Sequence, residues 1–246
     1  MSKINAYRQS LQELEDWIPF LCKESGLPGP RGNLELAYAV AEEGTKEQFE
    51  QLLTFQAEEN TPEVFLLFCG LVGLGKLTVK EPELFSKLCQ YASDSRWRIR
   101  EAVATGLQLA GDQDMDLLLK KMQGWSKGSW YEKRAAAATL AEPRLLKSPK
   151  HAKKVLQILD EVTKSMQRAQ GSKEESFKVL RQAMGYCWSV VVAALPAFGK
   201  PMMEKWLDSQ NKDIQWMMRE NLKKNRLVKM DENWVETCNR KLSQLA

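Results

Sequence analysis

The segment Asp94-Ser-Arg-Trp-Arg-Ile-Arg-Glu-Ala-Val-Ala-Thr-Gly-Leu-Gln-Leu-Ala-Gly111 decides the fold class. Apolar side chains recur in it at helical intervals, so one face of an α-helix would carry them all. These positions are Trp97, Val103, Leu107 and Ala110. Asp94 precedes the stripe and is placed to accept a hydrogen bond from an unpaired backbone N–H of the first turn. The segment therefore predicts an amphipathic helix with Asp94 as its N-cap and Trp97 in its first turn.

A second copy of this element lies 119 residues further along the chain. Asp94 to Glu101 and Asp213 to Glu220 share the pattern Asp-x-x-Trp-x-x-Arg-Glu at identical spacing, and Tyr131-Glu-Lys-Arg134 is a weaker echo. The separation is about three periods of a helical repeat near 40 residues. In each copy the arginine follows the tryptophan by three residues, which places both on nearly the same helix face. The arginine would then reach an aspartate or a carbonyl group of a neighbouring repeat.

Helical periodicity extends over most of the chain, and sustained two-residue alternation is hard to find. Turn-like breaks divide the sequence into about a dozen helices, with breaks expected among others at Gly111-Asp112 and at Gly199-Lys-Pro201. Short connections imply antiparallel neighbours, which form either a closed bundle or an open stack. The periodicity predicts an all-α fold. Because an internal repeat is present, we predict that the helices form a right-handed α-solenoid of about six helix pairs.

Residues 94–111 resemble the second helix of a HEAT repeat, whose pattern has an aspartate before the helix, then an arginine and a stripe of small residues and leucines. The resemblance implies an armadillo-type solenoid. It predicts a single domain over residues 1–246, in which residues 1–30 form an N-terminal helical cap and residues 31–245 form the repeats.

A more specific resemblance is to the alkylpurine DNA glycosylases, the DNA alkylation repair family. Three segments of this chain are similar to short sequence motifs of that family. They are residues 130–136 (Trp-Tyr-Glu-Lys-Arg-Ala-Ala), 182–186 (Gln-Ala-Met-Gly-Tyr) and 216–220 (Trp-Met-Met-Arg-Glu). The family's catalytic aspartate follows a tryptophan, whereas no Trp-x-x-x-Asp precedes Arg134 and the acid four residues after Trp97 is Glu101. The resemblance implies a surface that binds duplex DNA, with or without base excision.

One set of aromatic and basic residues forms the candidate binding site. Arginine binds phosphates bidentately, and aromatic rings stack on bases or sugars. Equivalent positions of successive repeats would line one concave face that binds a protein partner or duplex DNA. The alternative is that the tryptophans form the core between repeats and the arginines form ion pairs there. The set comprises Trp97, Arg100, Trp130, Tyr131, Arg134, Tyr186, Trp188, Trp216 and Arg219.

Charge is distributed unevenly along the chain. Residues 1–92 contain 8 Lys/Arg and 14 Asp/Glu, whereas residues 93–246 contain 28 Lys/Arg and 18 Asp/Glu. The first part is therefore acidic by 6 charges and the remainder basic by 10. This asymmetry indicates either an anion-binding surface or simply solvated lysine-rich helix faces.

The residues give no pattern typical of an active site or a metal site. Five scattered cysteines and the single His151 do not have zinc-ligand spacing, and His151 is expected on an exposed lysine-rich stretch. The glycines of Gly70-Leu-Val-Gly73-Leu-Gly75 lack the Lys-Ser/Thr of a phosphate-binding loop and indicate a helix end with close packing. We therefore predict a non-enzymatic binding or scaffold protein without cofactor or metal. We expect it to be monomeric and cytoplasmic and to have no membrane span.

Overall fold

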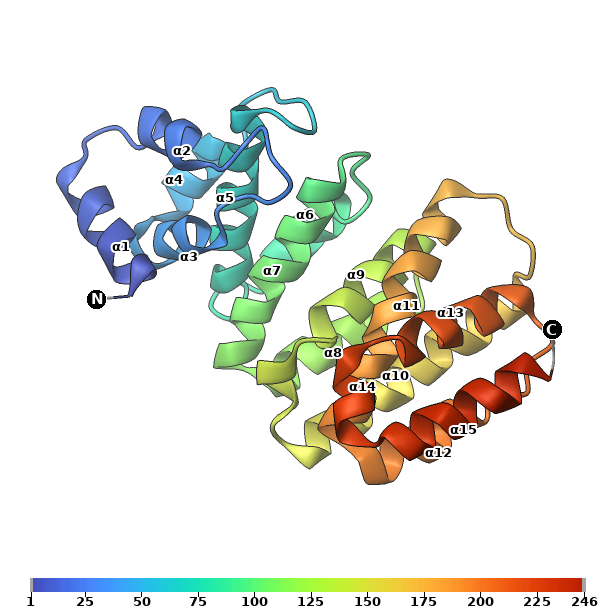
Figure 1. The fold of residues 1–246 in the computed structure, drawn as a ribbon. Helices are drawn as coiled ribbons and strands as arrows, with labels where there is room; N and C mark the ends of the chain where they lie inside the picture. Colours follow the sequence, from blue (N-terminus) through green and yellow to red (C-terminus); the bar gives the residue numbers. More distant parts are fainter. Residues whose placement is uncertain (1, 245–246) are drawn as a thin grey trace. The chain divides into compact units, whose positions relative to one another are not determined.

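The computed structural model describes residues 2–244, and every regular element in that range is helical (Figure 1). The range contains fifteen α-helices and one short 3₁₀ helix, with no strand. The prediction of an all-α fold is confirmed. The number of helices exceeds the dozen expected because several connections contain a short helix of six or seven residues, such as α14 (Asn225–Met230). No helix within residues 2–244 is long and apolar enough to cross a membrane.

Contacts divide the chain into two compact units, Met1–Asp114 and Met115–Ala246. The prediction of one repeat domain over residues 1–246 is not tested by this division and remains a prediction. The boundary falls at the junction of two helices, α7 and α8, and not at a long linker.

The first unit contains seven helices in two layers. The longer helices follow one another in chain order, since α1 packs on α3, α3 on α5 and α5 on α7. The remaining helices pack against this row, with α2 and α4 on α5 and α6 on both α5 and α7. Their bounds are α1 Lys3–Glu13, α2 Ile18–Glu24, α3 Leu34–Glu43, α4 Lys46–Leu52, α5 Pro62–Leu77, α6 Leu84–Tyr91 and α7 Trp97–Gln113.

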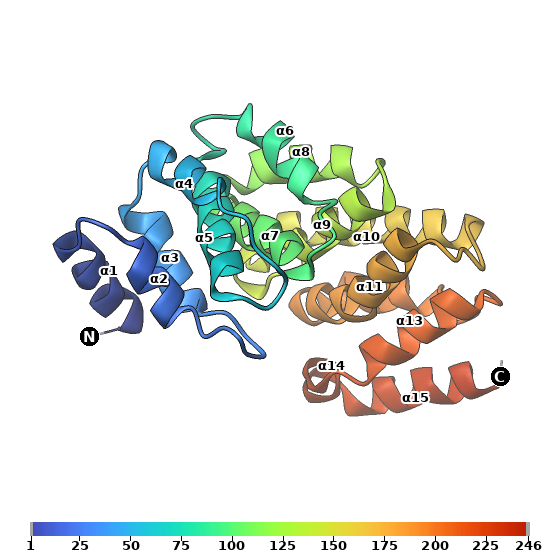
Figure 2. The ribbon, with the colours of Figure 1, turned by 90° about the horizontal axis from the view of Figure 1, so that it is seen from above.

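The second unit repeats this layering with eight further helices. A row of α9, α11, α13 and α15 is formed by contacts between successive members. The helices α8, α10 and α12 form a second layer, in which α10 contacts both of the others. Both views show α13 beside α11 (Figures 1 and 2). The bounds are α8 Met115–Trp125, α9 Trp130–Leu140, the 3₁₀ helix η1 Pro143–Leu146, α10 Pro149–Arg168, α11 Glu175–Ala194, α12 Pro196–Glu204, α13 Lys212–Leu222, α14 Asn225–Met230 and α15 Glu232–Ser243.

Glycines allow the closest helix crossing in the first unit. A Cβ atom at Gly75 of α5 would lie 2.4 Å from the carbonyl carbon of Gly106 of α7, and one at Gly73 would lie 2.4 Å from the Phe49 ring. The two backbones therefore approach each other closely enough to exclude any side chain. This geometry agrees with the close packing expected of Gly70, Gly73 and Gly75.

The two copies of Asp-x-x-Trp-x-x-Arg-Glu do not occupy equivalent helical positions. Asp94 lies before α7 and accepts hydrogen bonds from the backbone and side chain of Arg96, whereas Asp213 is already the second residue of α13. Asn211 is the N-cap there, because its side chain accepts from the Asp213 and Ile214 N–H groups at 2.8 and 3.2 Å. The prediction that Asp94 is the N-cap of its helix is wrong, because Arg96 occupies the N-cap position of α7, and Asp213 is not a cap either. A better-placed asparagine fills that role at α13.

Two expected breaks are also wrong. Gly111 lies inside α7, which continues to Gln113, and Gly199 and Pro201 lie inside α12. A Cβ atom at Gly199 would come 2.7 Å from Cα of Val192, so this glycine provides close packing between α12 and α11 instead of a turn. The chain turns earlier, at Leu195, immediately before Pro196 starts α12.

A buried asparagine fixes α13 against α11. Asn221 is fully buried, and its Oδ1 atom accepts a hydrogen bond of 2.8 Å from the Ser189 N–H. Its Nδ2 group donates to the carbonyl oxygens of Met184 at 2.7 Å and of Met217 at 2.8 Å. Because Ser189 and Met184 belong to α11, this side chain determines how the faces of α11 and α13 are placed relative to each other.

Candidate functional site

The candidate residues are divided between the two units. Trp97 and Arg100 belong to α7 of the first unit, and the other seven belong to α9, α11 and α13 of the second. In the second unit these three helices are consecutive neighbours, with α11 between α9 and α13.

Three members of the set are buried. Trp188 has no exposed surface, and its Nε1 group donates a hydrogen bond of 3.1 Å to Oγ1 of Thr163 in α10. Arg100 and Arg134 are each 7% exposed. Arg100 donates to the carbonyl oxygens of Asp94 and Ser95 at 2.6 and 2.7 Å, so it closes the turn before its own helix. In this structure these three side chains have structural contacts and little surface to offer a ligand.

Tyr186 is the most exposed aromatic side chain of the set in the second unit, at 41%. The Arg226 guanidinium of α14 lies 4.6 Å from its ring centroid and also donates a hydrogen bond to its hydroxyl oxygen. A cation above an aromatic face is attracted by the ring quadrupole. The pair therefore holds Arg226 in place at the protein surface.

A second cation–ring pair lies on the neighbouring helix. The Arg181 guanidinium of α11 is 4.4 Å from the ring centroid of Trp216 in α13 and donates to Oδ1 of Asp213 at 2.7 Å. A Cβ atom at Gly185 would be 3.2 Å from this indole, so the ring rests on the residue that precedes Tyr186. The two pairs thus lie near each other where α11 borders α13 and α14. We call the surface of Arg181, Tyr186, Trp216 and Arg226 the Tyr186–Trp216 face.

The remaining members of the set have local partners. The Trp130 ring lies edge-on to Phe177 at 5.3 Å, with the Lys133 ammonium 4.8 Å from its centroid. Burial lowers the pKa of the Lys133 ammonium, which donates to the Gly128 carbonyl oxygen. Arg219 donates to the Leu242 carbonyl oxygen of α15 at 3.2 Å, the kind of carbonyl contact expected for the motif arginine. Tyr131 is half-buried on α9.

Trp97 is separate from these residues and is 45% exposed at the start of α7. Its backbone N–H donates to Oε2 of Glu59 at 2.7 Å, and the Arg98 guanidinium lies 4.5 Å from its ring centroid. Arg98 is buried and donates to the Gly29 carbonyl oxygen and to Oδ1 of Asn60, which joins two loops of the first unit.

The charge asymmetry follows the division into units. Residues 1–114 contain 11 Lys/Arg and 18 Asp/Glu, a net charge of −7, whereas residues 115–246 contain 25 Lys/Arg and 14 Asp/Glu, a net charge of +11. A unit with this excess of cations attracts anionic partners over distances of about a Debye length, roughly 8 Å at physiological ionic strength.

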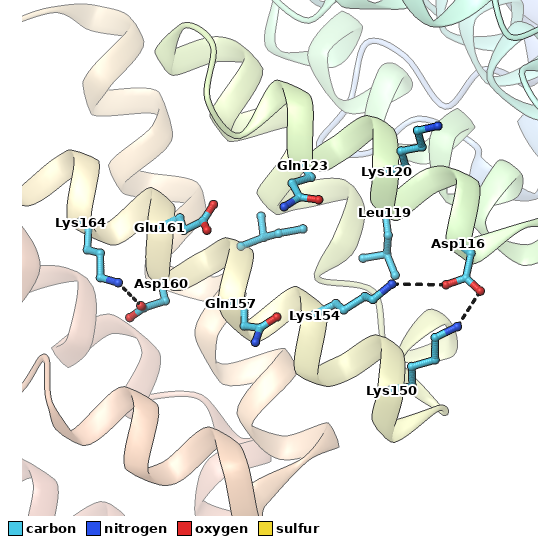
Figure 3. Close-up of a pocket in the computed structure, with 11 residues that line it drawn as sticks. Asp116, Leu119, Lys120, Gln123, Lys150, Lys154, Gln157, Asp160, Glu161 and Lys164 are labelled. Atoms are coloured by element: carbon cyan, nitrogen blue, oxygen red, sulfur yellow. Dashed lines mark hydrogen bonds and ion pairs between the residues drawn. The ribbon is translucent and has the colours of Figure 1, made fainter.

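A lysine-lined groove between α8 and α10 was not expected from the sequence. It encloses about 820 Å³ and carries Lys120, Lys150, Lys154 and Lys164. Asp116 lies between Lys150 and Lys154, and Asp160 with Lys164 is at the other end (Figure 3). The Lys150 ammonium, 2.8 Å from Asp116, keeps the pKa of that carboxyl below its usual value. The sequence signal was the lysine-rich stretch 147–154, which periodicity alone assigns to a solvated helix face.

His151 also belongs to this stretch, but it is half-buried and not exposed as expected. Its Nε2 atom lies 3.4 Å from Oδ1 of Asp116. Within residues 2–244, no three His, Cys, Asp or Glu side chains gather in the arrangement of a metal site.

The cysteines differ in burial. Cys69, Cys187 and Cys238 are buried, whereas Cys22 and Cys89 are half-buried. Burial raises the pKa of the Cys69 thiol well above its usual value and that of Cys238 to about 11. Such thiols remain protonated at neutral pH and are poor nucleophiles.

Comparisons with known proteins do not assign a family to this chain. No protein-family model matches it, and no curated protein is significantly similar to it.

Proposed function

We propose that this chain is a non-enzymatic helical binding protein whose second unit binds an acidic segment of a protein partner on the Tyr186–Trp216 face. One observation carries the proposal: the two cation–ring pairs lie together, partly exposed, on a unit with a net charge of +11. Arginine pairs bidentately with carboxylates, and an aromatic surface beside it adds apolar contact.

The charges on the face favour an acidic protein segment over a nucleic acid. Asp213 already pairs with Arg181, and Glu220 pairs with Lys223 at 2.6 Å. A phosphate backbone would bring one negative charge every few ångströms against these acids. A protein segment can place single carboxylates opposite Arg226 and apolar side chains on the two rings.

The finer architecture is part of the same proposal. In each unit a row of helices alternates along the chain with a second layer, which supports HEAT-like pairs stacked as a right-handed solenoid with a concave binding face. The odd number of cysteines, scattered along the sequence, supports a reducing compartment, the cytoplasm. We propose a monomer that uses no cofactor.

The test is the binding of a fluorescein-labelled synthetic peptide in which glutamates alternate with leucines, measured by anisotropy at low ionic strength. Arg226→Gln removes the cation above Tyr186, and Tyr186→Ala removes the ring beneath it. Arg226→Gln should weaken binding by about tenfold, the usual cost of losing a charged hydrogen-bonding partner. Tyr186→Ala should weaken it by a similar factor, because truncation of an aromatic contact residue commonly costs more than about 1 kcal/mol. Arg168→Gln is the matched control, because Arg168 is an exposed arginine of the same unit at the end of α10.

Two results would overturn the proposal. One is the absence of binding by the natural protein. The other is an equal loss in Arg168→Gln and Arg226→Gln, because binding would then depend on overall charge and not on the face. Circular dichroism of each variant verifies that helicity is unchanged.

A second candidate function, binding of duplex DNA, is favoured by the net charge of +11 and by the resemblance to the alkylation repair family. Its signature is an affinity for duplex DNA that falls steeply with salt, with a slope set by the number of phosphates contacted. Absence of binding at low salt rejects this candidate. Arg226→Gln is the appropriate variant, since Arg100 and Arg134 are buried and their replacement would disturb packing.

The enzymatic form of that candidate has its own assay. Release of methylated bases from alkylated duplex DNA is compared between the natural protein and Glu101→Gln, because Glu101 is the acid four residues after Trp97. No release by the natural protein eliminates base excision.

A further inference from the structure

A pocket in the first unit has an apolar floor and three charged residues in its lining, Arg31, Arg98 and Glu101. It encloses about 360 Å³, in the size range of small-molecule sites. The floor consists of Val64, Phe65 and Phe68 of α5, with the Phe65 and Phe68 rings stacked 6.1 Å apart. Trp97 and Leu34 complete its walls, and we call it the Trp97 pocket.

The two wall residues leave apolar surface open to solvent. Trp97 is 45% exposed and Leu34 is 43% exposed, and only Phe198 among the other large hydrophobic side chains of residues 2–244 is exposed as much. Both belong to the same pocket although 63 positions separate them in the sequence. Two exposed apolar side chains at one concave site indicate a surface that a ligand covers.

The charges at the rim define the polar end of that ligand. Arg31 is exposed and forms no hydrogen bond or ion pair with any residue between 2 and 244. The other charged groups of the pocket already have partners: Arg98 bonds Glu59 and the Gly29 carbonyl oxygen, and Glu101 also has an interaction partner. Arg31 is therefore the cation left to receive a ligand, and its local attraction for an anion has to outweigh the repulsion from a unit whose net charge is −7.

We infer that the Trp97 pocket binds a small amphipathic anion, with an apolar body on the phenylalanine floor and a carboxylate or sulfonate on Arg31. The floor supplies the hydrophobic contact and the guanidinium supplies a charge-assisted hydrogen bond. This inference concerns the first unit and does not depend on the function proposed for the second.

The probe is 1-anilinonaphthalene-8-sulfonate, an aromatic sulfonate whose emission rises in apolar surroundings, titrated into the full chain. Gly32→Leu fills the pocket, because a Cβ atom at Gly32 points at the Phe65 ring from 3.4 Å, an ordinary contact distance. It should abolish the saturable fluorescence. Arg31→Gln should weaken binding by about tenfold, whereas Lys23→Gln, an exposed lysine of α2, should leave it unchanged.

A second pair of variants guards against misfolding. Leu34 is exposed at the first position of α3, where a helix tolerates an acid well, so Leu34→Glu and Leu34→Gln should both fold. The glutamate variant should bind about fivefold more weakly than the glutamine variant, because only the former repels the anion.

Displacement by dodecanoate, with dodecanol as the uncharged comparison, tests the chemistry of the ligand. The inference requires that dodecanoate displaces the probe and that dodecanol does so at least about tenfold less well. Equal displacement by both would reject the anionic end. Undiminished probe binding by Gly32→Leu, or no saturable binding by the natural protein, would reject the site.

Discussion

Replacement of Asn221 by alanine should destabilise the second unit more than almost any other polar substitution. The side chain is fully buried and makes three hydrogen bonds, one from the Ser189 N–H and one each to the Met184 and Met217 carbonyl oxygens. Each such bond stabilises a fold by about 1 kcal/mol, and each buried group left unpaired costs about 1–3 kcal/mol. We expect the free energy of unfolding to fall by about 3–4 kcal/mol.

Urea unfolding followed by circular dichroism measures this loss. For a chain of this size, a loss of about 3 kcal/mol should lower the melting temperature by roughly 10 °C. Asn239→Ala is the control, because Asn239 is exposed on α15 and its replacement should change stability by less than about 0.5 kcal/mol.

Asn221→Asp separates hydrogen bonding from packing. Aspartate has nearly the volume of asparagine but presents an acceptor to the two carbonyl oxygens, so it should destabilise at least as much as alanine. A loss below about 1 kcal/mol for Asn221→Ala would contradict the importance of these hydrogen bonds, and a milder effect for Asn221→Asp would show that the side chain acts by its volume.

The remaining predictions concern helix packing, acid stability and a loop contact. Gly75→Ala should lower the stability of the first unit by at least about 2 kcal/mol in urea unfolding, because its methyl group would overlap the Gly106 backbone. Gly124→Ala, with no atom within 4 Å of the new methyl group, should stabilise by up to about 1 kcal/mol, and equal effects of the two would contradict the packing argument. Burial alone would raise the pKa of the Asp160 carboxyl, but hydrogen bonds from two lysines outweigh burial and the pKa is lowered. The ionised form therefore stabilises the fold above the unfolded pKa of about 3.9, and this contribution is lost as pH falls through the lower folded pKa. The stability difference between the natural protein and Asp160→Asn should shrink with acidification below about pH 4 in melting experiments, and a pH-independent difference would refute the assignment. Arg98→Lys should lower the melting temperature by several degrees, because an ammonium cannot bond two carbonyl oxygens and an amide in fork geometry, and an unchanged melting temperature would show that these loops are held by other contacts.

The candidate site shows what a sequence pattern can and cannot predict about the position of a side chain. The motif selected Trp97 and Trp216 as equivalent, yet Trp97 opens α7 with 45% of its surface exposed and Trp216 is the fifth residue of α13, half-buried under Arg181. Periodicity identifies residues on one side of a helix but does not identify what covers that side. Arg181 and Arg226, which complete the face, were missed because each lies in a different helix from the ring that it contacts.

The sequence by itself determined the helical class, the charge of each part of the chain and the dense packing at Gly70 to Gly75. These properties depend on composition and on contacts between residues close in the chain, so local spacing is sufficient to predict them. The helix that begins at Trp97 was predicted correctly for this reason, although its Asp94 cap was not.

Only the tertiary structure decided which aromatic rings are core and which are surface. Trp188 is covered because α10 supplies Thr163 and its apolar neighbours, whereas Tyr186, two positions earlier on α11, faces outward and meets Arg226. The two side chains have similar size and chemistry, and they differ in whether a distant helix packs against them. The contact of Trp188 with Thr163 joins residues 25 positions apart and that of Tyr186 with Arg226 joins residues 40 positions apart, and such contacts leave no periodic trace in the sequence.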